Sequence, residues 1–211
     1  MIRTLLAVSI KRALAAALVV FSLPAAAADK GQLDADPALF TVMAALDAAG
    51  YGTEANSPAN HPLRKAVREH LQKVNAPSLK ELKLFFAEHK LPDPGANLAQ
   101  YVSFALSVEG PPDFKFRYPL NELSPDVSPL QSLNELLAAF YKEANIEDVW
   151  EKSQPTIEQV LSAYQDPVTR GVQQANAYLR NPTSGFLGRR FQIYIDLLAA
   201  PNQVHTRSFK D

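Results

Sequence analysis

Apolar residues recur at three- and four-residue intervals along most of this chain, which is the spacing of one face of an α-helix. Leu39, Val42, Met43 and Leu46 form a clear stripe of this kind. The pattern predicts helices at approximately 36–50, 60–74, 78–90, 97–108, 129–144, 146–165 and 168–179. We therefore expect a mostly α-helical domain of about seven helices.

Start and stop signals bound several of these helices. Asp36 followed by Pro37 is an N-cap with a proline in the first turn, and Gly50 is placed to end the same helix. Ser78, with Glu81 three residues later, has the spacing of a capping box. These signals predict helix starts at 36 and at 78.

The helix over 60–74 has an apolar and a charged face. Val67 and Leu71 belong to the apolar face, whereas Arg64, Arg68 and Lys73 belong to the charged one.

Prolines predict interruptions in the last long helical stretch. Pro155 removes a backbone donor and should kink or split the helix over 146–165. Asp166 and Pro167 resemble a new cap, so a separate helix is expected from Val168. Three aromatic side chains of this part of the chain, Tyr141, Trp150 and Tyr164, are expected in the core or at an interface.

The period changes to two residues near the C-terminus. Every second residue from Phe191 to Leu197 is apolar, which indicates a half-buried strand. A turn at 200–202 and a second strand over 203–209 would complete a C-terminal β-hairpin. A lone hairpin is marginal in water, so either helices cover it or the natural chain continues beyond Asp211.

Two other stretches are less regular. Residues 29–35 are expected to be a loose segment. Phe114, Phe116 and Tyr118 alternate with basic residues, which allows a short strand, and nearby prolines place it at an edge.

The first 28 residues have the layout of a secretory signal peptide. Arg3, Lys11 and Arg12 precede an apolar run over 13–23, and small residues allow cleavage near 27–28. A retained membrane anchor is the alternative, but this run is shorter than the roughly 20 residues that span a bilayer. We therefore expect export to the periplasm or beyond, with membrane contact only through the leader before cleavage.

Removing this leader from the 211-residue chain leaves 183 residues with 18 basic and 22 acidic side chains. The resulting net charge of −4 argues against a nucleic-acid partner. The chain has no cysteine, which excludes disulfides, thiolate metal sites and a thiol nucleophile. We expect one domain over 29–211.

Familiar catalytic and metal-binding patterns are missing from the sequence. No two of its four histidines have the i, i+4 spacing that would let them share a metal ion. There is no P-loop, no GxGxxG and no GxSxG elbow. We expect no cofactor, no metal ion and no catalytic residue. Glycines before Arg189 and Arg190 could present an anion site, or simply form a loop that enters a strand.

Three stretches carry a resemblance to a known group: residues 40–51 with 60–62, residues 140–150, and residues 181–194 (NPTSGFLGRRFQIY). They resemble an uncharacterised group of exported bacterial proteins with a zincin-metallopeptidase-like layout. In that layout a helical N-terminal half precedes a sheet and a helix bearing HExxH. The chain contains no HExxH, so the resemblance implies the helical half and part of the substrate-side sheet, with 191–198 as the candidate strand.

Three functions remain open from these observations. The first is a non-catalytic exported domain, as the zincin-like resemblance implies. The second is a periplasmic module that binds a protein or peptide through the hairpin edge. The third is a metal-independent hydrolase, which needs a pocket that holds two carboxylates. The candidate contact surface for the second function comprises Arg189, Arg190, Phe191, Tyr194, Phe114, Phe116 and Tyr118.

Overall fold

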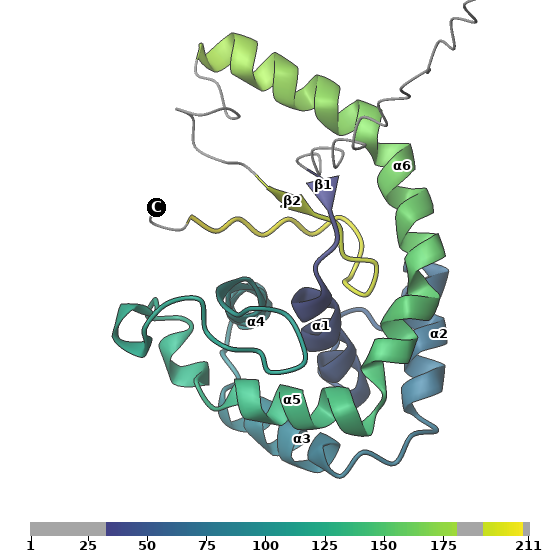
Figure 1. The fold of residues 1–211 in the computed structure, drawn as a ribbon, viewed down its shortest axis with the longest axis vertical. Helices are drawn as coiled ribbons and strands as arrows, with labels where there is room; N and C mark the ends of the chain where they lie inside the picture. Colours follow the sequence, from purple (N-terminus) through teal and green to yellow (C-terminus); the bar gives the residue numbers. More distant parts are fainter. Residues whose placement is uncertain (1–32, 181–191, 209–211) are drawn as a thin grey trace, which may run out of the picture. The chain divides into compact units, whose positions relative to one another are not determined.

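The structure is a computed structural model that describes residues 33–180 and 192–208. Within these residues the chain is mostly helical, as predicted, with six α-helices rather than seven (Figure 1). The α-helices are α1 (Pro37–Ala49), α2 (Pro62–Leu71), α3 (Ser78–Glu88), α4 (Pro94–Ser107), α5 (Leu133–Glu143) and α6 (Ile146–Leu179). The shorter elements are β1 (Leu33–Asp34), β2 (Ile193–Tyr194) and the 3-10 helices η1 (Leu120–Glu122) and η2 (Ser128–Leu130).

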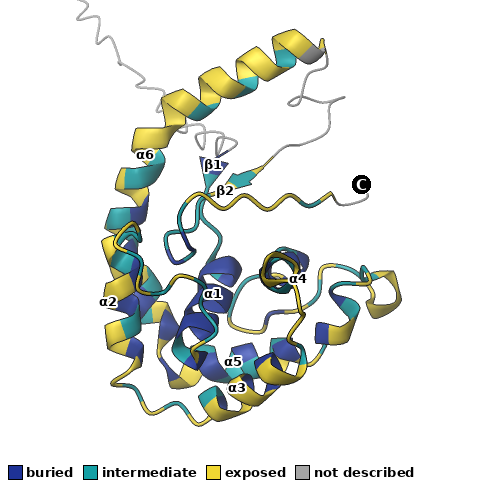
Figure 2. Ribbon diagram, turned by 180° about the vertical axis from the view of Figure 1, so that it is seen from behind, coloured by how far each residue is buried: buried dark blue, intermediate teal, exposed yellow. Residues whose placement is uncertain are grey.

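Helix α1 is the element around which the other helices pack. It contacts α2, α3, α4, α5 and α6, and all of its residues except Pro37 and Ala48 are buried (Figure 2). Its start is capped as predicted, because the Asp36 carboxylate accepts a 2.8 Å hydrogen bond from the Leu39 N–H. Its end is also as predicted, since Gly50 has a φ of 85°, which glycine adopts without strain.

Helix α3 begins at Ser78 without the expected capping box. No side chain caps this start. Instead, the Ser78 N–H donates a 2.8 Å hydrogen bond to the carboxylate of Glu143 at the end of α5. A tertiary contact therefore replaces the local one that Glu81 was expected to make.

Helix α4 begins earlier than its apolar stripe predicted. Asp93 caps it with a 2.6 Å bond from the Ala96 N–H, and Pro94 occupies the first turn. This is the same Asp-Pro signal that predicted the start of α1, so the sequence carried the information.

Helix α6 is continuous, so the separate helix expected from Val168 is wrong, and of the kink or split expected at Pro155 the split does not occur. Both prolines are exposed, and so are Glu151 and Ala163, whose carbonyls lose their helical partners. Water can reach these carbonyls, so each proline bends the helix without ending it. Figure 1 shows the bend along α6.

The predicted C-terminal β-hairpin is wrong. Strand β2 pairs in parallel with β1, with Leu33 opposite Ile193 and Asp34 opposite Tyr194. Residues 203–208 form no strand, and the stretch expected to be loose includes β1. Alternation identifies a strand but cannot identify its partner, which here lies at the other end of the sequence.

The segment after β2 (residues 195–208) makes one further backbone bond to β1, from the Ile195 N–H to the Asp34 carbonyl at 2.9 Å, and beyond it is held by contacts with the helical core. Its Leu198 is buried in the core. Arg207 donates hydrogen bonds to Asp126 (2.5 Å), to Ser103 of α4 (3.0 Å) and to Ser124. Burial alone would raise the pKa of Asp126, but the bonds from Ser124, Arg207 and Ser103 outweigh it and lower this pKa to about 2.

Candidate functional site

A buried ion pair joins α1 to α2. Arg64 Nε and Nη2 donate to the two carboxylate oxygens of Asp47 at 2.8 and 2.7 Å, and each side chain is 1% exposed. Arg64, which the sequence places on the charged face of this helix, is therefore buried. The Asp47 carboxylate holds it inside, because a buried guanidinium is tolerated when it is paired and hydrogen-bonded.

The loop between α1 and α2 completes the surroundings of Arg64. The guanidinium also donates to the Thr53 carbonyl at 2.9 Å and to the Asn60 side-chain oxygen at 3.1 Å. A Cβ placed on Gly52 would lie 1.6 Å from Asp47 Oδ1. This position therefore has to be glycine if the loop is to close over the pair.

A third ionisable group lies within electrostatic range of this pair. Asp196 is in the segment after β2, and its Oδ1 accepts a 2.8 Å bond from the Leu198 N–H. Burial raises the pKa of Asp196 to about 7, while the Leu198 N–H and Arg64 lower it and Asp47 raises it. The segment after β2 thus places a carboxyl that is half protonated near neutral pH beside α1 and α2.

Asp196 also lines a small cavity with the capping residue Asp36. Side chains of α1 and α6, Phe40 and Trp150 among them, form the other walls, and these two rings contact edge to face at 5.0 Å. Burial raises the pKa of Asp36, and N–H groups at the start of α1 partly offset this effect. The cavity has room for about one water molecule, so these two carboxyls have no space for a substrate between them.

A larger and more open recess lies where the loop after α4 meets α5 and α6. Its volume is about 420 Å³, within the range of small-ligand sites. The lining residues are Pro112, Asp113, Ala138, Tyr141, Lys142, Asn145 and Glu147. Burial raises the pKa of Tyr141, as do the nearby Glu147 and Glu151. Because charges of both signs line the recess, it does not indicate one class of ligand.

The residues of the predicted contact surface have diverse positions. Phe114 is fully buried, and Phe116 packs edge to face on Phe104 at 5.7 Å between ring centroids. These two rings belong to the core. The predicted strand around them reduces to one antiparallel bridge, between Val108 and Phe116. Tyr118 is half-buried.

The rest of that surface lies at β2 or beyond the described residues. Tyr194 is 37% exposed in β2. Arg189, Arg190 and Phe191 lie outside the part of the chain that the structure describes. An anion site at the two arginines stays a prediction.

The second half of α6 has only exposed and partly exposed side chains among the residues that the structure describes, and Leu161, Val168 and Val172 are partly exposed. From residue 158 to residue 180, which we call the α6 arm, no described side chain is buried (Figure 2). Tyr164 is 54% exposed and Tyr178 is 88% exposed, so Tyr164 is not a core residue. The arm is about six turns long, and a helix of this length gains most of its stability in proteins from packing.

The histidines have structural or surface positions. His61 caps α2, where its Nδ1 accepts a 3.1 Å bond from the Leu63 N–H. Within residues 33–180 and 192–208, no three His, Asp or Glu side chains gather in a way that could hold a metal ion. Among the helices of the same residues, none is long and apolar enough to cross a membrane.

Sequence reasoning missed the Asp47, Arg64 and Asp196 cluster. One signal was available, because Asp47 is the single charged residue of α1, whose other residues except Thr41 are apolar. An acid in such a helix calls for a buried cation. Which cation it pairs with could not be predicted, since the charged face of α2 offers several.

Comparison with known proteins gives no relatives. No family model matches the chain, no curated protein matches it, and no solved structure matches it.

Proposed function

We propose that this chain is an exported, non-catalytic interaction module that binds a protein partner through the α6 arm. One observation carries the proposal: the arm holds six helical turns with apolar side chains and contributes no described side chain to the core. Exposed apolar residues on a helix of this length are typical of a surface that is covered by a partner. The signal-peptide pattern of the sequence supports the exported location.

The charges of the arm favour a protein over other polymers. Its four charged residues are Glu158, Asp166, Arg170 and Arg180. Two are acidic and two are basic, whereas nucleic acids and anionic membranes are recognised by an excess of Lys and Arg. A balanced, partly apolar helix fits the groove or helix of another protein.

The hydrolase alternative is less well supported. It requires a pocket with two carboxylates. The larger recess has Glu147 and Asp113, but Asp113 is 62% exposed and paired with Lys115 at 3.0 Å. The small cavity provides Asp36 and Asp196. The cavity holds about one water molecule, and the Asp36 carboxylate already serves as the cap of α1. A non-catalytic role therefore fits the geometry better.

The zincin-like resemblance stays a prediction within this proposal. It implies that the chain is a helical half without its own zinc site. Reading the coding DNA beyond the Asp211 codon tests it. An in-frame continuation that encodes HExxH would support the resemblance and a peptidase role for the longer protein.

Position-dependent photo-crosslinking tests the role of the arm. A photoreactive amino acid at Tyr164 is compared, in producing cells, with the same amino acid at Arg170, which lies on the opposite face of the arm. We expect a discrete protein adduct from position 164 and at least tenfold less from position 170. No adduct from 164, or equal adducts from both positions, would contradict the proposal.

A further inference from the structure

Five apolar positions of the α6 arm are spaced symmetrically about the middle one, Val168. Leu161 and Tyr164 precede Val168 by seven and four residues, and Val172 and Ala175 follow it by four and seven. At about 100° per residue, all five lie within about 40° of one line, which bends with the helix at Pro167. Tyr164 and Ala175 are exposed, and Leu161, Val168 and Val172 are partly exposed. The arm therefore has an apolar stripe with a centre of symmetry at Val168.

A symmetric stripe of this kind is complementary to itself. If two arms pair antiparallel about Val168, Tyr164 of each faces Val172 of the other, and Leu161 faces Ala175. Each large side chain then meets a smaller one, which is how facing helices interdigitate. A two-fold interface needs this reciprocal relation, in which one residue contacts another and is contacted by it in return.

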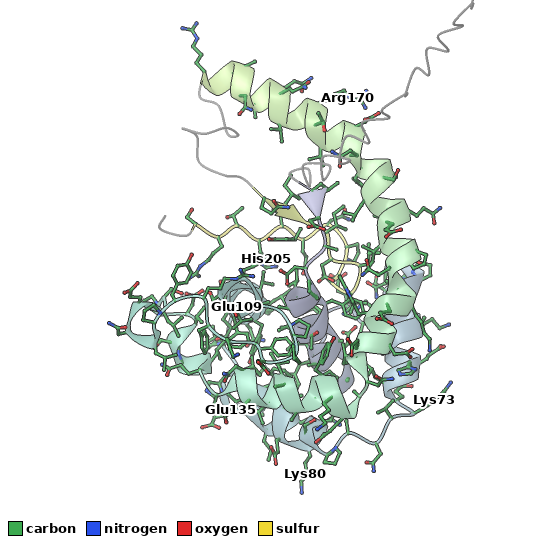
Figure 3. The ribbon with its side chains drawn as sticks, in the orientation of Figure 1. Lys73, Lys80, Glu109, Glu135, Arg170 and His205 are labelled. Carbon is green, nitrogen blue, oxygen red and sulfur yellow. The ribbon has the colours of Figure 1, made fainter. Side chains whose placement is uncertain are left out.

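The polar residues of the arm are placed so that such a pair buries no charge. Asp166 and Arg170 lie about 160° around the helix from Val168, and both are exposed; Arg170 is labelled in Figure 3. Gly171 flanks the stripe, with no heavy atom within 4 Å of a Cβ built on it. Its small size permits the close approach of a second helix.

We infer that the partner of the α6 arm is a second copy of this chain, bound antiparallel about a two-fold axis at Val168. The inference rests on the proposed function, because it names the partner of the same surface. The contact spans only about four turns, so it buries less than the roughly 1,600 Å² of a standard interface. The dimer should therefore be reversible and depend on protein concentration.

Single cysteines test this arrangement sharply, because the natural chain contains none. In Val168→Cys the two new thiols lie at the two-fold axis, within the reach of a disulfide. We expect mild oxidation to give at least tenfold more disulfide-linked dimer from Val168→Cys than from the opposite-face control Arg170→Cys. Equal yields would overturn the inference.

A mixing experiment determines the direction of the helices. In the antiparallel pair, two copies of position 161 lie about 21 Å apart, whereas position 161 of one chain faces position 175 of the other. Leu161→Cys alone should therefore give no linked dimer, and a mixture of Leu161→Cys with Ala175→Cys should give the mixed one. Linked dimers from Leu161→Cys alone would overturn the antiparallel pair.

Sedimentation of the cysteine-free protein separates this inference from the proposed function. We expect a concentration-dependent dimer for the natural sequence and a monomer for Val168→Asp, with the same circular dichroism. A natural protein that stays monomeric at 100 μM overturns the second copy as partner. If position 164 then still crosslinks to a different protein, the arm remains an interaction surface; if it crosslinks to nothing, the proposed function also fails.

Discussion

Helix α1 and the α6 arm show two ways in which a helix of one chain meets its surroundings. Almost every residue of α1 is buried, and its single charge is neutralised by Arg64. The arm has polar residues around an interrupted apolar stripe, and none of its described side chains is buried. A helix that is apolar on all sides is enclosed by its neighbours, whereas a narrow stripe can be covered by one partner.

The two environments also meet within a single helix. The first half of α6 contributes Ile146, Val149 and Ile157 to the buried residues, and the arm that continues it adds no described side chain to them. The lesson is that an unbroken helix does not imply uniform packing. Substitutions at the buried ion pair should therefore change the free energy of unfolding more than substitutions in the arm. Replacing a glycine by alanine should lower this free energy beside the ion pair and raise it in the arm.

The largest effect is expected at the buried ion pair. Arg64→Met leaves the Asp47 carboxylate buried without its cation, so the free energy of unfolding should fall by about 3–5 kcal/mol. Urea denaturation at pH 7 measures this loss. Lys65→Met is the control, since that side chain is 79% exposed, and it should change the free energy by less than about 0.5 kcal/mol. Equal small losses would mean that Arg64 is solvated after all.

A pH series tests the carboxyl beside this pair. The pKa of Asp196 is about 7 in the folded protein and 3.8 in its ordinary state. The folded state therefore binds the Asp196 proton more tightly than the unfolded state does. The stabilisation that this proton gives to the fold is complete below about pH 4 and is lost as the pH rises to about 7.

Asp196→Asn keeps the oxygen that accepts from Leu198 but cannot ionise. Its free energy of unfolding relative to the natural protein should rise by up to about 1.4 kcal/mol per pH unit between pH 4 and 7. Chemical denaturation at each pH provides the curve. A difference that does not vary with pH would mean that Asp196 is ionised throughout this range.

A smaller loss is expected where the loop crosses the ion pair. Gly52→Ala introduces a Cβ 1.6 Å from Asp47 Oδ1, so the loop or the pair must move. We expect the free energy of unfolding to fall by about 1–3 kcal/mol, as for other overpacked sites. Thermal and urea denaturation should both show this loss of stability. An unchanged stability would show that the loop does not close over Asp47 in solution.

The smallest effect is expected at the glycine of the arm. Gly171→Ala meets no atom within 4 Å and removes a poor helix former, so the arm should gain about 0.5–1 kcal/mol. Amide hydrogen exchange over 164–178 should slow by about two- to fivefold. The comparison is made in dilute, monomeric protein, so that a weaker contact between two arms does not contribute. Faster exchange than in the natural protein would then indicate that this position is not helical in solution.

Several elements followed from the sequence because their causes are local. The cap at Asp36, the end of α1 at Gly50 and the amphipathic stripes all depend on residues within a few positions of one another. The start of α4 at Pro94 had the same local cause. The start of α3 at Ser78 was predicted correctly for an incorrect reason, because Glu143 of α5 supplies the hydrogen bond.

The candidate sites depended less on local pattern. The stripe of the α6 arm is in the sequence, but the expected break at Pro167 concealed it, and only the structure shows that the stripe is not buried among the described residues. The role of Arg64 could not be predicted, because its partner lies on another helix and depends on how α1 and α2 pack. Strand β2 has the expected period, yet its partner β1 comes from the opposite end of the chain.

By itself, the sequence determined that this protein is mostly helical and where most helices begin and end, since capping and amphipathic spacing act over a few residues. Only the tertiary structure decided that Asp47 and Arg64 are buried together, that Asp196 is held nearby with a raised pKa, and that the second half of α6 adds no described side chain to the core. Burial and charge pairing depend on segments that are distant in the sequence, and no local pattern specifies which of them meet.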